Sequence, residues 1–251
     1  MLGERQAIEV FHLLFLRAFG ARVDKGLFAL KGGCNLRFFH KSSRYSEDMD
    51  LDIRALSVGT LRNTVDRVLS TPAFAQTLRT QQIDIAEVTR SKQTETTQRW
   101  KVGLLVGGIT PLPTKIEFSR RALDGGLDVA PVDPELIRAY RLYPVLVQHY
   151  DASTAFWQKV LALALRSQTQ ARDVFDLKHL LDTAGAPGEP PHNIRAKLGR
   201  AIEAALSIDY DAFAGQVVAY LEPDYQDHYR RRQTWETLQN EVVNALEALQ
   251  S

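Results

Sequence analysis

Three aspartates alternate with apolar residues in the first half of the chain, and this spacing is suited to binding a metal ion. The stretch contains, in order, Asp48, Met49, Asp50, Leu51, Asp52 and Ile53. On an extended strand, residues two apart share a face, so the acids would share an open face and the apolar side chains would enter a core. Carboxylates this close repel one another unless a cation lies between them. Mg²⁺, which prefers oxygen ligands, is the simplest candidate, and it indicates chemistry on a phosphate.

A metal site of this kind needs a further carboxylate on a neighbouring strand, and Glu117 is the candidate. It alternates with Ile116 and Phe118, so it would face away from the core as the aspartates do. Two aspartates and one such acid can hold two metal ions in nucleotidyl transfer. Asp52 would then be dispensable. The alternatives are that Glu117 is a surface acid and that the acidic stretch is a solvated edge strand.

A calcium-binding EF-hand is excluded. Counted from Asp48, the loop would need Gly at its sixth position and Glu at its twelfth, and these positions hold Ile53 and Gly59.

A glycine turn precedes the acidic stretch. Lys31, Gly32 and Gly33 are followed by a short expected helix over 34–40. Free backbone amides at a helix start bind phosphate, and glycines leave them accessible. The turn therefore favours a nucleotide phosphate site beside the acidic strand.

A lysine lies on an otherwise apolar helix in the second half of the chain. Lys159 shares one helical face with Leu163 and Arg166. A buried lysine needs a negative partner, and a nucleotide triphosphate would be one. Asp173 and Asp176, at the start of the next helix, offer the alternative of a favoured helix start with intramolecular salt bridges.

The pattern of elements predicts a mixed α/β half followed by a helical half. We expect strands near 27–30, 48–53, 83–88, 100–106 and 115–119, and helices over 4–19 and 34–40 and after Ser57. A further helix would start at Asp133, and later ones would cover about 153–167, 172–183, 193–206, 210–221 and 224–249. The boundary would divide a core domain, 1–125, from a helical lobe, 126–251, with a cleft between them.

Composition limits the environment and the partners. The formal net charge is +1, so a nucleic acid would have to be held by local basic clusters. The candidates are Arg120 with Arg121, and Arg230 with Arg231 and Arg232; the alternative for the second cluster is a solvated helical face. The single cysteine fits a reducing compartment, and neither a signal peptide nor a bilayer-spanning run is apparent. We therefore expect a cytoplasmic protein without membrane contact.

Taken together, the motifs resemble those of the AbiEii/AbiGii toxin family of nucleotidyltransferases, which includes the mycobacterial MenT toxins. The matching motifs are Leu30-Lys31-Gly32-Gly33-x-x-Leu36, Arg44-x-Ser46-x-Asp48-x-Asp50-Leu51, and the Lys159 helix followed by Arg172-Asp173-x-x-Asp176-Leu177. The resemblance covers about residues 25–185. It implies an α+β fold, namely a DNA polymerase β-type nucleotidyltransferase mixed sheet with helices, followed by an all-helical C-terminal lobe.

The resemblance also implies an activity and partners. It implies Mg²⁺-dependent transfer of nucleotides from an NTP to the 3′ end of tRNA, by a toxin that has a cognate antitoxin and often acts in abortive phage defence. Two Mg²⁺ ions are expected, with Mn²⁺ as a substitute. The alternatives are the same chemistry on a protein or small-molecule acceptor, and a catalytically silent relative that binds only a nucleotide or a partner.

The resemblance assigns roles to individual residues. Asp48 and Asp50 match the family's metal ligands, and Glu117 matches its third acid. Lys159 matches the lysine that contacts the nucleotide phosphates, and Asp173 matches an acid near the active site. Arg44 and Ser46 match residues that shape the site. One position departs from the family pattern: Cys34 stands where a small hydroxyl residue is common. A thiol is the weaker hydrogen-bond donor, so only the backbone amides are expected to bind phosphate there.

Overall fold

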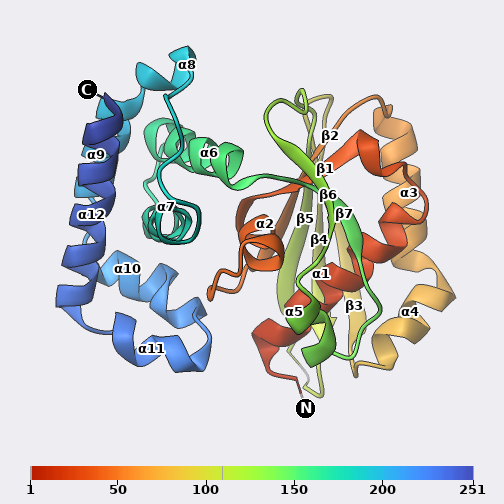
Figure 1. Ribbon diagram of the computed structural model, residues 1–251. Helices are drawn as coiled ribbons and strands as arrows, with labels where there is room; N and C mark the ends of the chain where they lie inside the picture. Colours follow the sequence, from red (N-terminus) through yellow and green to blue (C-terminus); the bar gives the residue numbers. More distant parts are fainter. Residues whose placement is uncertain (1, 109, 251) are drawn as a thin grey trace. The chain divides into compact units, whose positions relative to one another are not determined.

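The computed structural model describes residues 2–108 and 110–250, which form a mixed sheet and two groups of helices (Figure 1). Two compact units are distinguished. The first comprises the residues up to Phe39 together with Tyr45–Tyr150, and the second comprises His40–Arg44 together with the chain from Asp151 onward. The sheet belongs to the first unit and the C-terminal helices to the second, which confirms the α+β class.

The seven strands of the first unit run in the order β3-β4-β5-β2-β1-β7-β6. Their bounds are β1 Phe28–Lys31, β2 Asp48–Ile53, β3 Asp84–Gln93, β4 Thr97–Leu105, β5 Leu112–Ser119, β6 Leu127–Pro131 and β7 Leu146–Tyr150. The helices of this unit are α1 Glu4–Gly20, α2 Gly32–Phe39, α3 Val58–Ser70, α4 Pro72–Arg79 and α5 Pro134–Ala139. β2 pairs antiparallel to β1 and parallel to β5, so the acidic strand lies inside the sheet.

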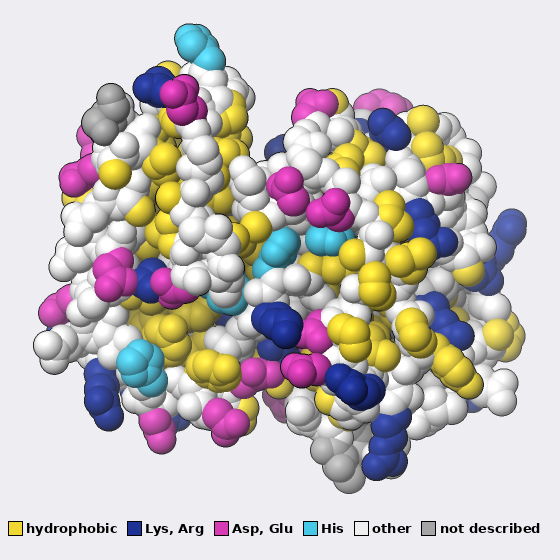
Figure 2. All heavy atoms as spheres, in the orientation of Figure 1, with side chains coloured by type: hydrophobic (Ala, Val, Ile, Leu, Met, Phe, Trp, Pro, Cys, Tyr) yellow, Lys and Arg dark blue, Asp and Glu magenta, His cyan; other side chains and the backbone are white. Residues whose placement is uncertain are grey.

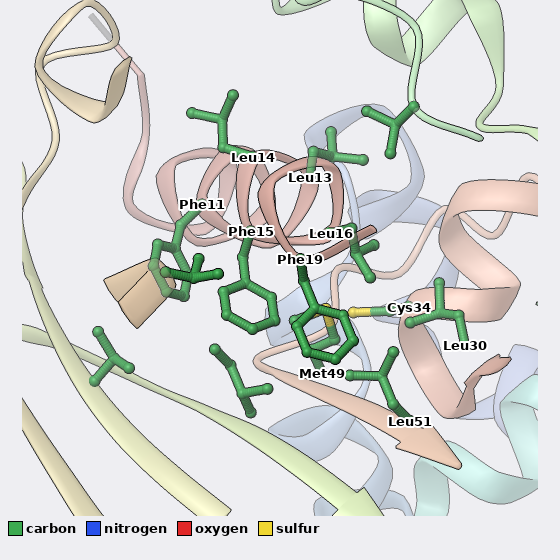
Figure 3. Close-up of a cluster of buried hydrophobic side chains, with 14 of the residues drawn as sticks. Phe11, Leu13, Leu14, Phe15, Leu16, Phe19, Leu30, Cys34, Met49 and Leu51 are labelled. Carbon is green, nitrogen blue, oxygen red and sulfur yellow. The ribbon is translucent and has the colours of Figure 1, made fainter. Parts of the chain in front are cut away.

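Helix α1 supplies much of the core of the first unit. Phe11, Phe15 and Phe19 recur at helical spacing and are fully buried. Figure 3 shows Phe15 and Phe19 pointing from the helix toward Met49 and Leu51 of β2. Together with α3 and α4, α1 covers one face of the sheet (Figure 1). Because Met49 and Leu51 are held against these rings, the acids that alternate with them are turned to the other face.

Two strands and one helix of the first unit were not predicted. β6 lies between the last expected strand and the helix expected at Asp133, where no element was predicted, and β7 lies where the pattern predicted only helices. β7 was missed because its inner residues are almost fully buried although Gln148 and His149 are polar, so it shows no alternation. The short helix α4 begins at Pro72, which is well suited to the first helical turn.

The helices of the second unit are α6 Ala152–Leu165, α7 Ala171–Ala184, α8 His192–Arg195, α9 Leu198–Leu206, α10 Tyr210–Gln216, α11 Pro223–Tyr229 and α12 Arg232–Gln250. α12 buries one stripe of side chains, with Trp235, Leu238, Val242 and Leu246 in the core and Leu249 half-buried. Trp235 stacks on Phe213 of α10 with 4.5 Å between ring centroids.

Three predicted helices of this unit are shorter than expected. The single helix expected over 224–249 is wrong, because the chain breaks between α11 and α12, where Tyr210 donates a hydrogen bond to the carbonyl oxygen of Arg230 and Thr234 to that of His228. Side chains thus replace the helical bonds of those carbonyls. The helix expected over 193–206 is likewise two, α8 and α9, and the one expected over 210–221 ends at Gln216.

Candidate active site

The acidic strand and its neighbours place charged side chains in two rows on the open face of the first unit's sheet. Strand pairing sets Asp48 opposite Lys115, and Lys115 opposite Lys101. The next row sets Asp50 between Lys31 of β1 and Glu117 of β5, and Glu117 opposite Arg99 of β4. The register confirms that Glu117 lies beside the acidic strand and on the same face, as its alternation predicted.

Two of the three candidate metal-binding acids form ion pairs. Lys115 Nζ lies 2.7 Å from Asp48 Oδ2. Arg99 donates to Glu117 Oε2 at 2.5 Å. Both pairs are partly exposed. The repulsion expected among these carboxylates is therefore reduced by basic side chains on the neighbouring strands.

Asp50 lies between these pairs and differs from both acids. Within residues 2–108 and 110–250 its carboxylate has neither a hydrogen bond nor an ion pair. Burial raises the pKa of Asp50, Glu117 and Asp48 raise it further, and the charges of Lys31 and Lys115 oppose that rise. A carboxylate so placed gains from a cation delivered by a ligand.

Gly32 makes the approach to Asp50 open. Its φ of +67° is in the left-handed region that glycine adopts without strain. A Cβ at this position would lie 3.1 Å from Asp50 Oδ2. Because α2 starts at Gly32, the amides of its first turn have no carbonyl partner within the helix. The glycine turn and the acidic strand are thus parts of one site.

The third acid of the strand has a different environment. Asp52 is 4% exposed. It accepts hydrogen bonds from Lys31 Nζ at 2.5 Å and from the Tyr150 hydroxyl at 2.9 Å. Both of its oxygens are occupied by protein donors, so Asp52 fixes Lys31 rather than offering a free ligand.

A buried polar cluster lies behind the start of β2. Cys34 Sγ donates to the carbonyl oxygen of Asp48, and Thr114 donates to that of Glu47 at 2.6 Å. Ser46 also donates to the Asp48 carbonyl, at 2.9 Å. His12 contacts both Thr114 and Cys34 from α1, and its burial lowers its pKa to about 4. These contacts fix the backbone that carries Asp48.

Cys34 itself is inside the core. It is 1% exposed, and burial raises the pKa of its thiol, so it is neither a nucleophile nor a surface donor. Figure 3 shows it among the hydrophobic side chains. The backbone amides of the turn remain as the groups that can bind phosphate.

The donors at this site suit a hard divalent cation. Within the described residues no group of three or more His, Cys, Asp or Glu side chains is arranged to hold a metal ion. Mg²⁺, however, is commonly bound through one or two carboxylates together with phosphate oxygens of the substrate. Asp48 and Asp50, two apart on one strand face, meet that requirement, and the unpaired carboxylate of Asp50 is the observation that favours it.

Lys159 and Asp173 lie in the second unit, in a buried ionic network. Lys159 Nζ lies 2.9 Å from Asp173 Oδ1 and 2.6 Å from Asp176 Oδ2. Arg44 donates to both oxygens of Asp176, at 2.9 to 3.1 Å. Arg166 Nε lies 3.1 Å from Asp173 Oδ2 without forming a hydrogen bond. The intramolecular salt bridges that the sequence offered as an alternative for Lys159 are therefore present.

Opposite charges shift the pKa values of two members of the network, Lys159 and Asp176. Burial alone would lower the pKa of Lys159, but Asp173 and Asp176 outweigh it and raise that pKa. Burial alone would raise the pKa of Asp176, but Arg44 and Lys159 hold it below its ordinary value. Each charge is thus stabilised by opposite charges and not by water.

The predicted basic clusters are only partly available. Arg120 donates to the carbonyl oxygen of Leu56 and to Gln98 Oε1, whereas Arg121 is exposed. Arg230 pairs with Asp227, and Arg232 lies over the ring of Tyr210. Figure 2 shows acidic and basic side chains interspersed on the face in view, as the small net charge suggests.

Sequence reasoning did not assign site roles to Lys115, Arg99 and Tyr150. The sequence did carry a signal for Lys115 and Arg99, because each alternates with core residues. Lys115 therefore shares the face of Glu117 on β5, and Arg99 lies on the same face of β4. Tyr150 had none, since β7 was not predicted and pairing with β1 brings it beside Asp52 over a long sequence distance.

Comparisons with known proteins identify the family of the chain and similar folds. A family model described as "Nucleotidyl transferase AbiEii toxin, Type IV TA system" matches residues 14–248. Among solved structures, a Helicobacter pylori protein assigned as a nucleotidyltransferase matches with a TM-score of 0.64, 16% identity and full coverage of both chains. The nucleotidyltransferase toxin MenT4 of Mycobacterium tuberculosis matches with a TM-score of 0.63 and 17% identity over 100% of this chain and 96% of that one. No curated protein matches the sequence.

Proposed function

The chain belongs to the AbiEii family of nucleotidyltransferase toxins of type IV toxin–antitoxin systems, and from that premise we propose that it transfers nucleotides from an NTP to the 3′ end of tRNA. The observation that carries the proposal is Asp50, which lies without a partner between the Gly32 turn and Glu117. Phosphate-binding amides, carboxylates for a metal and a third acid are the groups that nucleotidyl transfer requires.

The residues of the first unit have distinct roles in this proposal. The amides of Gly32 and Gly33 bind the triphosphate, with Lys31 adding positive charge. Asp48 and Asp50 hold two Mg²⁺ ions, or Mn²⁺ in their place, and Glu117 shares in holding them; bound metal would neutralise charge on the triphosphate. Glu117, held by Arg99, orients the attacking hydroxyl of the acceptor. Ser46 fixes the backbone of Asp48.

The second unit contributes through its ionic network and its arginines. We assign to Lys159 a contact with the nucleotide phosphates, to Asp173 a place near the active site, and to Arg44 the positioning of that pair through Asp176. Arg231 and Arg232 would contact the phosphate backbone of the acceptor, as would Arg121 of the first unit. Reversing the charges of Arg231 and Arg232 should weaken RNA binding; unchanged binding would dismiss that cluster.

The proposal also implies where the protein acts and with whom. A type IV toxin has a cognate antitoxin, and its substrate is an NTP. Both NTPs and tRNA are found in the cytoplasm, so we place the reaction there. Among the described residues, no helix combines the length and apolar character needed to cross a membrane.

Transfer of label from each NTP tests the proposal. The protein is incubated with Mg²⁺, one labelled NTP at a time and total tRNA, and the label in the RNA and protein fractions is counted. We expect label in tRNA with the wild type and at least about a hundredfold less with Asp48→Ala. The matched control is Asp84→Ala, an exposed acid on β3 that should keep full activity.

Each alternative has its own outcome. Label in protein or in small molecules would replace the tRNA acceptor with that class. Label transfer that survives Asp48→Ala would refute the assigned metal ligand. Nucleotide binding without transfer to any acceptor would identify a catalytically silent relative.

A further inference from the structure

A hollow of about 360 Å³ lies beside Asp48, over strands β3, β4 and β5 of the first unit. Its volume is within the range of ligand pockets, about 300–1,000 Å³. It lies on the β5 side of the acidic strand, whereas the Gly32 turn lies on the β1 side. The roles proposed above leave this hollow without an occupant.

Gly103 keeps the hollow open. It faces Glu87 of β3 and Pro113 of β5 in the strand pairing. A Cβ at this position would lie 3.0 Å from Glu87 Cγ and 3.1 Å from Pro111 Cβ. Any side chain here would press on Glu87 and Pro111, which line the hollow, and so would change its shape. The two prolines and the bare backbone of the glycine form a wall without polar side chains, against which a base or a ribose can pack.

The rim of the hollow is polar and carries both charges. Lys101 is exposed, and within the part of the chain that the structure describes it has no ion pair. Lys115 donates to Asp48, which leaves two of the three protons of its ammonium group available. Glu87 adds a carboxylate that can accept hydrogen bonds from hydroxyl and amino groups. A site of this composition suits a nucleoside with one flanking phosphate better than a triphosphate.

The geometry of the reaction decides which nucleoside fits. In nucleotidyl transfer, the attacking oxygen and the leaving pyrophosphate are roughly in line, on opposite sides of the phosphorus. If the triphosphate lies over the Gly32 turn, pyrophosphate leaves on the β1 side of Asp50. The attacking hydroxyl then approaches from the β5 side, where Glu117 and the hollow lie.

We propose that this hollow binds the 3′-terminal nucleoside of the acceptor RNA, with Lys101 contacting the phosphate that precedes it. The inference rests on the proposed function and adds the place of the acceptor to it. It makes Gly103 and Lys101 determinants of acceptor binding, with no part in binding the NTP.

Two variants test the hollow from different sides. Gly103→Val reshapes it, because the added side chain presses on Glu87 and Pro111, and valine suits a strand. Lys101→Gln removes one exposed charge. Lys92→Gln is the matched control, because Lys92 is an exposed lysine on β3 that does not line the hollow. The probes are a 5′-fluorescent RNA hairpin with a single-stranded 3′ end, followed by anisotropy, and each NTP, followed by its KM and by calorimetry. Circular dichroism confirms that each variant is folded.

The expected results separate the two substrates. Lys101→Gln should weaken RNA binding and raise the KM for RNA about fivefold, the scale of one hydrogen bond. Gly103→Val should do so more strongly, and Lys92→Gln should change neither value. The KM and the affinity for the NTP should stay within about twofold for all three variants.

The other outcomes overturn the inference. A change in NTP affinity without a change in RNA binding would make the hollow part of the donor site. Unchanged RNA binding in both variants would leave it no role in acceptor recognition. If the wild type transfers no nucleotide to RNA, the proposed function fails, and the anisotropy measurement still decides whether RNA occupies the hollow.

Discussion

The buried network of the second unit gives a prediction whose magnitude follows from its contacts. Asp176 is fully buried and accepts from Arg44 on both oxygens, while Lys159 lies 2.6 Å from Oδ2. Asp176→Asn keeps the size of the side chain and removes its charge. Lys159 then keeps its pairing with Asp173, whereas Arg44 loses its ion pair with the carboxylate of Asp176. Breaking a buried pair by removing one partner costs about 3–5 kcal/mol, and we expect a loss of that size.

Urea denaturation followed by far-ultraviolet circular dichroism measures the loss. With an m-value of about 2–3 kcal/mol/M, the midpoint should fall by about 1–2 M. The control is Asp182→Asn, the same substitution in the same helix, because Asp182 is 55% exposed and pairs with Lys178 at the surface. An exposed pair contributes about 1 kcal/mol or less, so this midpoint should move little.

Acid provides a second measurement of the same network. The pKa of Asp176 is below its ordinary value, so its contribution is present above the unfolded-state pKa, near 3.9, and is lost as the pH falls through the lower folded-state value. The stability difference between the wild type and Asp176→Asn should therefore shrink below about pH 4. Equal losses for Asp176→Asn and Asp182→Asn at pH 7 would refute the view that the network stabilises the second unit.

Three further predictions concern the first unit. Asp50→Asn should reduce nucleotide transfer at least about a hundredfold. It should not lower the melting temperature, because the raised pKa of Asp50 means that its negative charge opposes folding above pH 4. A clear fall in the melting temperature would contradict this reasoning. Gly32→Ala should lower the free energy of unfolding by about 1 kcal/mol or more and impair metal-dependent transfer. Gly59→Ala, near the start of α3, where an added Cβ would meet no side chain closer than 3.9 Å, should be neutral or stabilising in the same denaturation assay. Burial lowers the pKa of His12 to about 4, so the free energy of unfolding of the wild type should fall by up to about 3 kcal/mol between pH 6.5 and 4. His12→Gln should make the free energy of unfolding depend less on pH over this range. An equal dependence in both proteins would refute the assignment.

The parts of the site that the sequence predicted well are those set by local alternation. The period of two in β2 was enough to place Met49 and Leu51 in the core and the acids opposite them. The same period in β5 placed Glu117 on the acid face, and the strand pairing confirms that it faces Asp50. Both inferences work because a strand packed on one helical layer has only one buried face.

The parts that the sequence could not predict depend on which distant segments meet. The partner of Lys159 could have been a ligand or a nearby acid, since burial requires a negative charge in either case and does not identify it. The pairing of Arg44 with Asp176 joins residues far apart in the chain, with no local pattern to reveal it. The break between α11 and α12 likewise depends on Tyr210, which lies outside both helices.

The division of labour among the three aspartates of β2 follows from their neighbours and not from their spacing. Lys115 pairs with Asp48 and Lys31 pairs with Asp52, so each flanking acid fixes a lysine on an adjacent strand. Asp50 lies between the two lysines without pairing with either, and their charges limit the rise in its pKa that burial causes. A carboxylate left without a protein donor in this way is available to a cation that arrives with a substrate. Asp52, which the spacing alone marked as dispensable, therefore contributes by keeping Lys31 beside Asp50.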